Sequence, residues 1–172
     1  MNLSDAKTIN ADRAAVYAAL LNPDVLMECV PGCQEMTGSP EDGFEAVVVQ
    51  KVGPVKATFK GAVALSDMVE AQSLTISGEG KGGAAGHAKG GAKVRLEDQD
   101  GQTVLHYEVE AKVGGKLAQL GSRIIDGFAK KMADQFFTNF QNAVGAPTDA
   151  DTDIQNDDTP KKRGWFKKPV TS

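Results

Sequence analysis

The chain has 172 residues, of which 41% are hydrophobic and 24% charged, and its 19 basic and 23 acidic residues give a net charge of −4. This length predicts one domain with a substantial core, and the acidic balance argues against a general nucleic-acid-binding protein, which needs a basic surface. The sequence has no run of 18 apolar residues, so we expect no transmembrane helix. The first ten residues, MNLSDAKTIN, lack the basic start and apolar stretch of a secretory signal. Together with only two cysteines, this predicts a protein of the reducing cytoplasm.

The N-terminal part predicts a weak strand in the first nine residues, followed by helical segments. Residues 11–22 (ADRAAVYAALLN) favour a helix with Asn10 or Asp12 as its N-cap. The apolar side of this helix consists of Val16, Leu20 and Leu21. Pro23 then opens a further short turn over residues 24–29.

The middle of the chain predicts antiparallel strands, because apolar and polar residues alternate there with the period of a half-buried strand. Shorter runs cover residues 44–52 and 74–76, and longer runs cover 55–65, 84–96 and 103–113. Gly78, Gly80 and Gly83 match the spacing of a dinucleotide-binding loop, but a strand pattern follows them where that loop needs a helix. We therefore expect these glycines to form a tight connection between strands.

After the last strand, residues 116–144 predict one long amphipathic helix of 29 residues, which would span about 43 Å. Its apolar stripe consists of Leu117, Leu120, Ile124, Phe128, Met132, Phe136 and Phe140. Strand, short helices, meander and long C-terminal helix together predict an α+β helix-grip fold, in which a curved antiparallel sheet of six to seven strands wraps around the helix.

The inward face of the sheet is short of side-chain volume in one place. The inward positions of the run 84–96 include Ala84, Gly86, Ala88, Gly90 and Ala92. Two explanations fit this pattern: either the helix approaches the sheet closely there, or an apolar ligand pocket remains. The sequence alone leaves both open.

Motifs for metal binding and catalysis are weak. Cys29 and Cys33 would need two further zinc ligands, and both histidines, His87 and His106, fall on the outward phase of their strands. The sequence contains no recognisable nucleophile–base pair. A general acid or base could still come from Asp67, Glu70, Glu79 or Tyr107.

The composition changes near residue 145. Residues 145–160 contain five Asp and one large aliphatic residue, which predicts a disordered acidic linker. Residues 161–172 then predict a basic-aromatic segment for contact with an anionic membrane surface. The residues expected to make this contact are Lys161, Lys162, Arg163, Trp165, Phe166, Lys167 and Lys168. A solubilising tail or a protein-docking peptide is the alternative, and the folded domain is expected over residues 1–144.

Several ordered motifs bring one family into view: PGC at 31–33, VGPVK at 52–56, FKG at 59–61, GEGKG at 78–82, GGKLAQLGSR at 114–123 and FF at 136–137. With these motifs, residues 1–144 resemble the CoxG family of carbon monoxide dehydrogenase subunits, within the START/Bet v 1-like (SRPBCC) superfamily. The resemblance implies a non-catalytic, cytoplasmic accessory protein without a covalent cofactor or metal. Such a protein would bind a lipophilic ligand, menaquinone or ubiquinone, and serve a molybdenum hydroxylase of the carbon monoxide dehydrogenase type on the inner face of the cytoplasmic membrane.

The residues expected to line the ligand pocket come from the inward phases of the strands and the helix stripe: Phe59, Val63, Ile76, Val94, Tyr107, Leu120, Ile124, Phe128 and Met132. They would supply shape and apolar burial, and Tyr107 could donate a hydrogen bond to a quinone carbonyl. Two other classes stay open. A small enzyme of the polyketide cyclase/hydratase kind would place polar residues with perturbed pKa values in the cavity, and an assembly or docking protein would have a filled interior and an exposed apolar patch.

Overall fold

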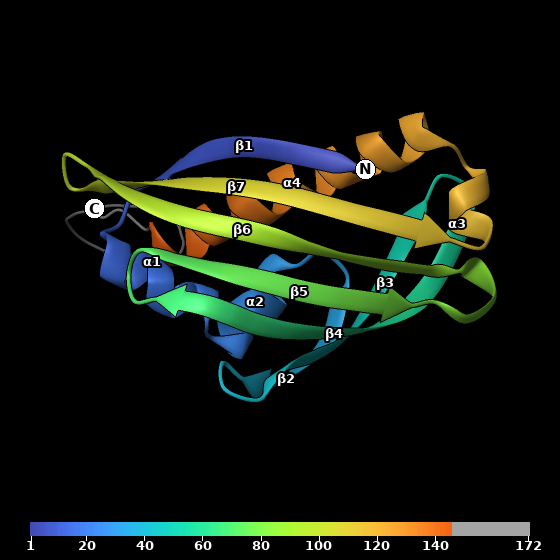
Figure 1. The fold of residues 1–172 in the computed structure, drawn as a ribbon, viewed down its shortest axis with the longest axis horizontal. Coiled ribbons are helices and arrows are strands. Elements are labelled where there is room, and N and C mark those ends of the chain that lie inside the picture. The colour runs from blue at the N-terminus through green and yellow to red at the C-terminus, as the bar shows by residue number, and fades with distance from the viewer. Residues whose placement is uncertain (146–172) are drawn as a thin grey trace, which may run out of the picture.

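In the computed structural model of the chain, residues 1–145 are described (Figure 1). They form one seven-stranded antiparallel sheet in the order β1-β7-β6-β5-β4-β3-β2. The strands are β1 (Asn2–Ile9), β2 (Cys33–Ser39), β3 (Gly43–Val52), β4 (Val55–Val69), β5 (Ser73–Lys81), β6 (His87–Gln99) and β7 (Gln102–Gly114). The C-terminal helix α4 (Ser122–Val144) runs behind the sheet, so the predicted helix-grip fold is confirmed.

The strand predictions hold where alternation is strict. Along β4 the exposure alternates from Val55 to Leu65, and β7 buries Leu105 and Tyr107 on the predicted inward face. The predicted start of β6 at Ala84 is wrong. Residues Gly83–Ala85 form a short 3-10 helix, η1, and Gly86 has a φ of 116°, a conformation that interrupts an extended strand.

Two further strand segments differ from the predictions. The sequence pattern does not predict β2, because CQEMTGS shows no clean alternation, and this strand forms by pairing with β3. β5 continues through Gly78 and Gly80 to Lys81, so the prediction that these glycines connect strands is wrong. Both glycines are paired within the sheet, opposite Val63 and Gly61 of β4.

The two N-terminal helices have side-chain caps. Asp12 Oδ1 accepts a hydrogen bond of 2.8 Å from the Ala15 amide at the start of α1 (Arg13–Leu20). Asn22 Oδ1 accepts one of 2.9 Å from the Asp24 amide, and the segment predicted as a turn is the helix α2 (Pro23–Cys29). These short-range polar side chains satisfy amides that have no partner inside the helix.

The C-terminal helical region is broken, in contrast to the prediction of one continuous helix. A single turn, α3 (Lys116–Gln119), precedes α4, and Gly121 between them has a φ of 91°. The 23 residues of α4 span about 35 Å, shorter than the predicted length. No helix within residues 1–145 is long and apolar enough to cross a membrane.

Packing divides the interior into two apolar clusters. The larger cluster joins α1, α2 and the C-terminal part of α4 to the sheet, and its buried members include Val16, Leu105 and Phe140. The smaller cluster joins α3 and the start of α4 to the β3–β4 hairpin through Val52, Leu117 and Ile125. The glycine- and alanine-rich part of the sheet lies between these clusters.

Candidate ligand-binding site

Small residues line the inward face of the sheet between the two clusters. The strand register places Gly61, Gly80 and Ala88 side by side, and the next inward row contains Gly78, Gly90 and Ala111. A side chain at Gly90 is excluded by the neighbouring strand, because a Cβ there would lie 2.2 Å from the Glu110 carbonyl oxygen. This part of the interior is therefore left with little side-chain volume.

The long helix does not fill this space. A Cβ added at Gly80 would meet only the Lys60 carbonyl oxygen, at 4.0 Å, and one at Gly61 would meet only backbone oxygens of neighbouring strands. Helix α4 has its closest neighbours in α2, β1 and β3 instead. Of the two explanations for the small residues, close helix packing is therefore wrong at these positions, and an open hollow remains.

The hollow around this part of the sheet measures about 1760 Å³. Its lining includes residues from both faces of the thin, glycine-rich sheet, so the concave part accounts for only some of this volume. Apolar side chains on the concave face of the lining are Leu3, Phe44, Val63, Ile76, Val109 and Val113. A concave, largely apolar site of several hundred cubic ångströms is typical of small-molecule binding sites.

The residues predicted to bind a ligand fall into several groups. Val63 and Ile76 line the hollow directly. Val94 and Tyr107 belong to the larger cluster, whereas Phe59, Leu120 and Phe128 belong to the smaller one. Met132 is half-buried on α4. The structure thus places most of the predicted set at the two ends of the hollow and two members along its wall.

Ile124 does not join the interior. Its side chain is 40% exposed and lies beside Gly53 in the β3–β4 turn. The neighbouring Ile125 is the residue that packs into the smaller cluster. The prediction assumed a continuous helix from residue 116, and the break at Gly121 changes which side of α4 faces the sheet.

Other lining residues were missed by the sequence prediction of the site, among them Leu3, Phe44 and Val109. Phe44 lies on β3 directly opposite Val63, and Leu3 lies on β1 directly opposite Val109. Val109 is on the predicted inward face of its strand, and the same alternation could have identified Phe44. The weak pattern of the first nine residues gives no such signal for Leu3.

Tyr107 is the polar group that lies closest in sequence to this lining. Its ring stacks on Phe137 of α4, with 5.1 Å between ring centroids, and its side chain is 5% exposed. No hydrogen bond of its hydroxyl is found within residues 1–145, whereas the Tyr17 hydroxyl donates one of 3.0 Å to the Ser73 carbonyl oxygen. Burial, and then the negative charge of Asp5, raises the pKa of Tyr107, so the phenol stays neutral and able to donate.

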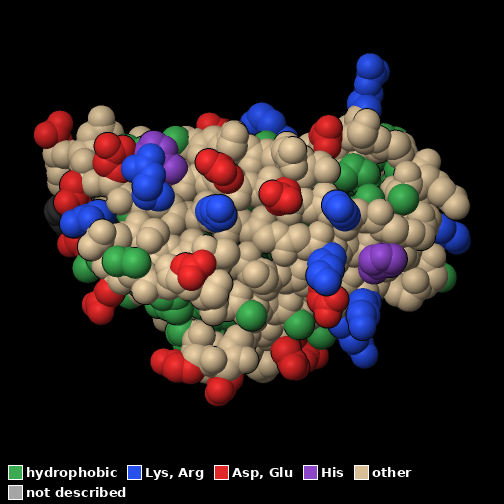
Figure 2. All heavy atoms as spheres, viewed as in Figure 1, with side chains coloured by type: hydrophobic (Ala, Val, Ile, Leu, Met, Phe, Trp, Pro, Cys, Tyr) green, Lys and Arg blue, Asp and Glu red, His purple; other side chains and the backbone are tan. Residues whose placement is uncertain are grey.

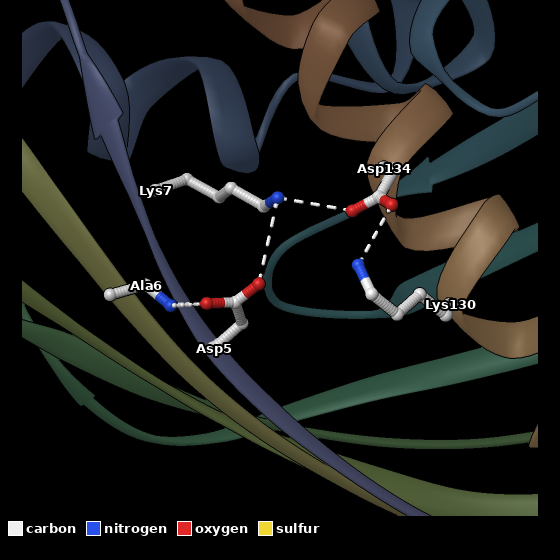
Figure 3. Close-up of polar contacts among 5 residues, drawn as sticks. All are labelled: Asp5, Ala6, Lys7, Lys130 and Asp134. Carbon is white, nitrogen blue, oxygen red and sulfur yellow. Dashed lines mark hydrogen bonds and ion pairs between the residues drawn. The ribbon is translucent and has the colours of Figure 1, made fainter.

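Four charged residues join the edge strand β1 to α4 on the same side of the sheet (Figure 3). Lys7 Nζ lies 3.0 Å from Asp134 Oδ1 and 3.6 Å from Asp5 Oδ2, and Lys130 Nζ lies 2.9 Å from Asp134 Oδ2. The hydrogen bond from Lys130, followed by that from Lys7, lowers the pKa of Asp134. The hydrogen bond to Asp134 raises the pKa of Lys7. The amide of Ala6, and then Lys7, lowers the pKa of Asp5.

The cysteines and histidines have structural surroundings. Cys29 is buried and Cys33 half-buried, and both are free thiols whose pKa is raised by burial. A raised pKa leaves less of the reactive thiolate at neutral pH. His106 Nε2 lies 2.9 Å from Glu97 Oε1 on the outer face. Within residues 1–145, no group of three or more His, Cys, Asp or Glu side chains is placed to hold a metal ion.

Solved structures support the helix-grip assignment. A conserved protein from Geobacillus kaustophilus is 26% identical, with a TM-score of 0.78, and the match covers 84% of this chain and 95% of that protein. A protein from Chromobacterium violaceum is 13% identical with a TM-score of 0.63, covering 86% and 99% of the two chains. Ara h 8.0201, which has a Bet v 1-like fold, is 14% identical with a TM-score of 0.58, covering 84% and 97%.

No curated protein is a significant match to this chain. A family model, however, matches nearly the whole described domain, and it agrees with the motifs quoted from the sequence. Because this match to CoxG, the G-type subunit of carbon monoxide dehydrogenase, extends over residues 6–145, the chain belongs to the CoxG family.

Proposed function

We propose that this protein is a non-catalytic accessory protein that holds a lipophilic ligand in the hollow, and that the ligand is an isoprenoid quinone, menaquinone or ubiquinone. The observation that carries this proposal is the open space over Gly61 and Gly80, which α4 leaves unfilled. Apolar side chains such as Val63 and Ile76 line the hollow and would bury the ring and the first part of a prenyl chain.

The family also supports a partner for the protein. CoxG is named as a subunit of carbon monoxide dehydrogenase. We therefore place the protein beside a molybdenum hydroxylase of that type on the inner face of the cytoplasmic membrane, where it would carry quinone between the enzyme and the bilayer. Affinity purification of the tagged full-length chain from its native host, with molybdenum measured in the eluate, tests this partnership.

The acidic linker and the basic-aromatic segment lie outside the described residues, except for Gly145, so their roles stay predictions. Their sequences support a reversible membrane contact, in which the basic residues from Lys161 to Lys168 meet anionic headgroups and Trp165 and Phe166 lie at the interface. Co-sedimentation of the full-length chain and a 1–144 truncation with anionic liposomes tests this contact. Equal pelleting of the two forms would remove membrane contact from the tail's role.

Native mass spectrometry of the full-length protein, purified from a host that makes quinone, tests the ligand. We expect a bound species whose mass, after solvent extraction, is that of menaquinone or ubiquinone. A clean apo mass from protein that also fails to take up either added quinone would contradict the proposal.

The hollow also bears on the two other classes. A docking protein predicts a filled interior, and the open space over Gly80 favours ligand binding instead. A cyclase or hydratase predicts polar groups with perturbed pKa values that converge inside the cavity. The shifted pKa values of Asp5, Lys7 and Asp134 arise from their contacts between β1 and α4, which gives these groups a structural role.

A further inference from the structure

Basic side chains gather at one end of the outer face of the sheet. Lys60 of β4 lies directly opposite Lys81 of β5, and Lys81 lies directly opposite His87 of β6. Two positions further along the strands, Lys89 lies directly opposite Lys112 of β7. All five side chains are exposed. This row-by-row register brings together on four adjacent strands residues that are far apart in the sequence.

A third basic pair extends the patch to the next hairpin. Lys51 and Lys56 face each other across the β3–β4 turn, and both are exposed. We define the basic end as Lys51, Lys56, Lys60, Lys81, Lys89 and Lys112. On the right side of Figure 2, blue side chains gather with few red ones between them.

These lysines are not neutralised by the domain itself. Within residues 1–145, the ion pairs of lysine and arginine involve Lys7, Arg13 and Lys130, and none involves the basic end. Glu79, directly opposite Lys89, is the acidic residue in these strand rows. Like charges directly opposite each other on neighbouring strands destabilise a sheet, so this arrangement has a cost that an anionic partner would offset.

The opposite end of the sheet is acidic. The β4–β5 hairpin carries Asp67 and Glu70, and the β6–β7 hairpin carries Asp98 and Asp100, all exposed. The chain as a whole has a net charge of −4, so the basic end is a local feature that general composition does not explain. Charge separated along the strands would orient the domain near a negatively charged surface.

Two apolar features connect the basic end to lipid. Ile124, 40% exposed, lies beside Gly53 at the tip of the β3–β4 hairpin, which also carries Lys51 and Lys56. The lining of the hollow reaches this end of the sheet, since Lys81, Lys89 and Lys112 belong to it together with Ala88 and Val113. Positive charge, an exposed aliphatic side chain and an apolar hollow thus occur together.

We propose that the basic end docks the folded domain on an anionic phospholipid surface, with the strand ends that carry Lys60, Lys81 and Lys112 facing the headgroups. This inference rests on the proposed function, which brings the protein to a membrane, and it extends the contact from the tail to the domain. A basic residue held near an anionic leaflet raises the binding constant by a factor of about five. The effect extends over about one Debye length, roughly 10 Å at moderate salt.

The test compares two triple variants of the full-length chain with the same change in net charge. The first is Lys60→Gln, Lys81→Gln and Lys112→Gln in the basic end. The control is Lys93→Gln, Arg95→Gln and Lys131→Gln, which removes three exposed charges elsewhere. Each is co-sedimented with vesicles of equal parts phosphatidylglycerol and phosphatidylcholine, and with phosphatidylcholine alone, and circular dichroism checks that each variant folds.

We expect the basic-end variant to bind the anionic vesicles at least about tenfold more weakly than the unmodified chain, and the control to change by less than about twofold. The unmodified chain should bind phosphatidylcholine vesicles weakly. Equal losses in the two variants, no loss in either, or no binding of the unmodified chain would each overturn the proposal. Quinone detected by native mass spectrometry is read without vesicles, so a failure of docking is distinguishable from a failure of the proposed function.

Discussion

Lys7 on the edge strand β1 and Asp134 on α4 form an ion pair of 3.0 Å, which ties the border of the sheet to the helix that it surrounds. Asp134 also accepts a hydrogen bond of 2.9 Å from Lys130, one turn earlier on the same helix. The pair thus joins the first strand of the chain to its last helix at one side of the interior.

This relationship predicts a pH-dependent contribution to stability. Because the native contacts lower the pKa of Asp134 below its ordinary value of 3.8, the stabilisation is fully present above that value and is lost as the pH falls through the lower native pKa. Asp134→Asn should therefore lower the free energy of unfolding at neutral pH, and the difference from the unmodified chain should shrink in strong acid. Urea denaturation over a pH series measures this difference, and one that stays constant down to the most acidic point would contradict the assignment.

Tyr107 and Tyr17 are equally buried, at 5% exposure, but only the Tyr17 hydroxyl has a hydrogen bond to the described part of the protein. Tyr17→Phe should lower the free energy of unfolding by about 1 kcal/mol. Tyr107→Phe should leave stability nearly unchanged but weaken quinone binding by about three- to tenfold, since a ligand carbonyl would lose its donor. Urea denaturation and quinone titration of the two variants separate these effects, and a large stability loss in Tyr107→Phe would show that its hydroxyl has a structural role.

The opposed lysines of the basic end predict a substitution that stabilises the fold. Lys81→Gln removes a charge directly opposite Lys60, so the free energy of unfolding should rise by about 0.2–1 kcal/mol. Lys93→Gln is the matched control on the same face, because Lys93 lies directly opposite Glu108 and its loss should lower stability by a similar amount. Urea denaturation at low salt measures both, and the same sign for the two variants would contradict the charge argument.

The break before α4 predicts opposite effects at two glycines. Gly121 has a φ of 91°, so Gly121→Ala should lower the free energy of unfolding by about 1 kcal/mol or more. Gly127 lies inside α4 with open space around it, and Gly127→Ala should raise it by about 0.5–1 kcal/mol. Thermal denaturation of the two variants tests the break directly, because a continuous helix through residue 121 would make both substitutions stabilising.

The fold could largely be predicted from the sequence where a local pattern decides the structure. The alternation from Val55 to Leu65 has the period of a strand, and this face is inward as expected. β2 has no such pattern and depends on its partner β3. A lone glycine inside a helical pattern is usually tolerated, so nothing local indicates that Gly121 ends one helix and begins another.

The same limit applies to the site. Val63 and Ile76 line the hollow because strand alternation fixes the side to which they point. The position of Ile124 depends on the break before α4, which the pattern does not reveal. Whether Gly61 and Gly80 face a helix or a hollow depends on the distance between helix and sheet, which follows from the packing of α4 against β1, β3 and α2 and is not encoded at the glycines themselves.

The central claim is that the space over Gly80 holds the ligand. In Gly80→Leu the new side chain enters this space, which is free of other side chains, whereas the control Ser77→Leu adds the same group on the outer face of the same strand. The measurement is the uptake of menaquinone and ubiquinone by the three proteins, with the bound fraction read by native mass spectrometry. We predict that uptake falls at least about tenfold in Gly80→Leu, because a blocked apolar site loses the burial that drives binding, and stays unchanged in Ser77→Leu. Uptake by a folded Gly80→Leu equal to that of the unmodified chain would contradict the account.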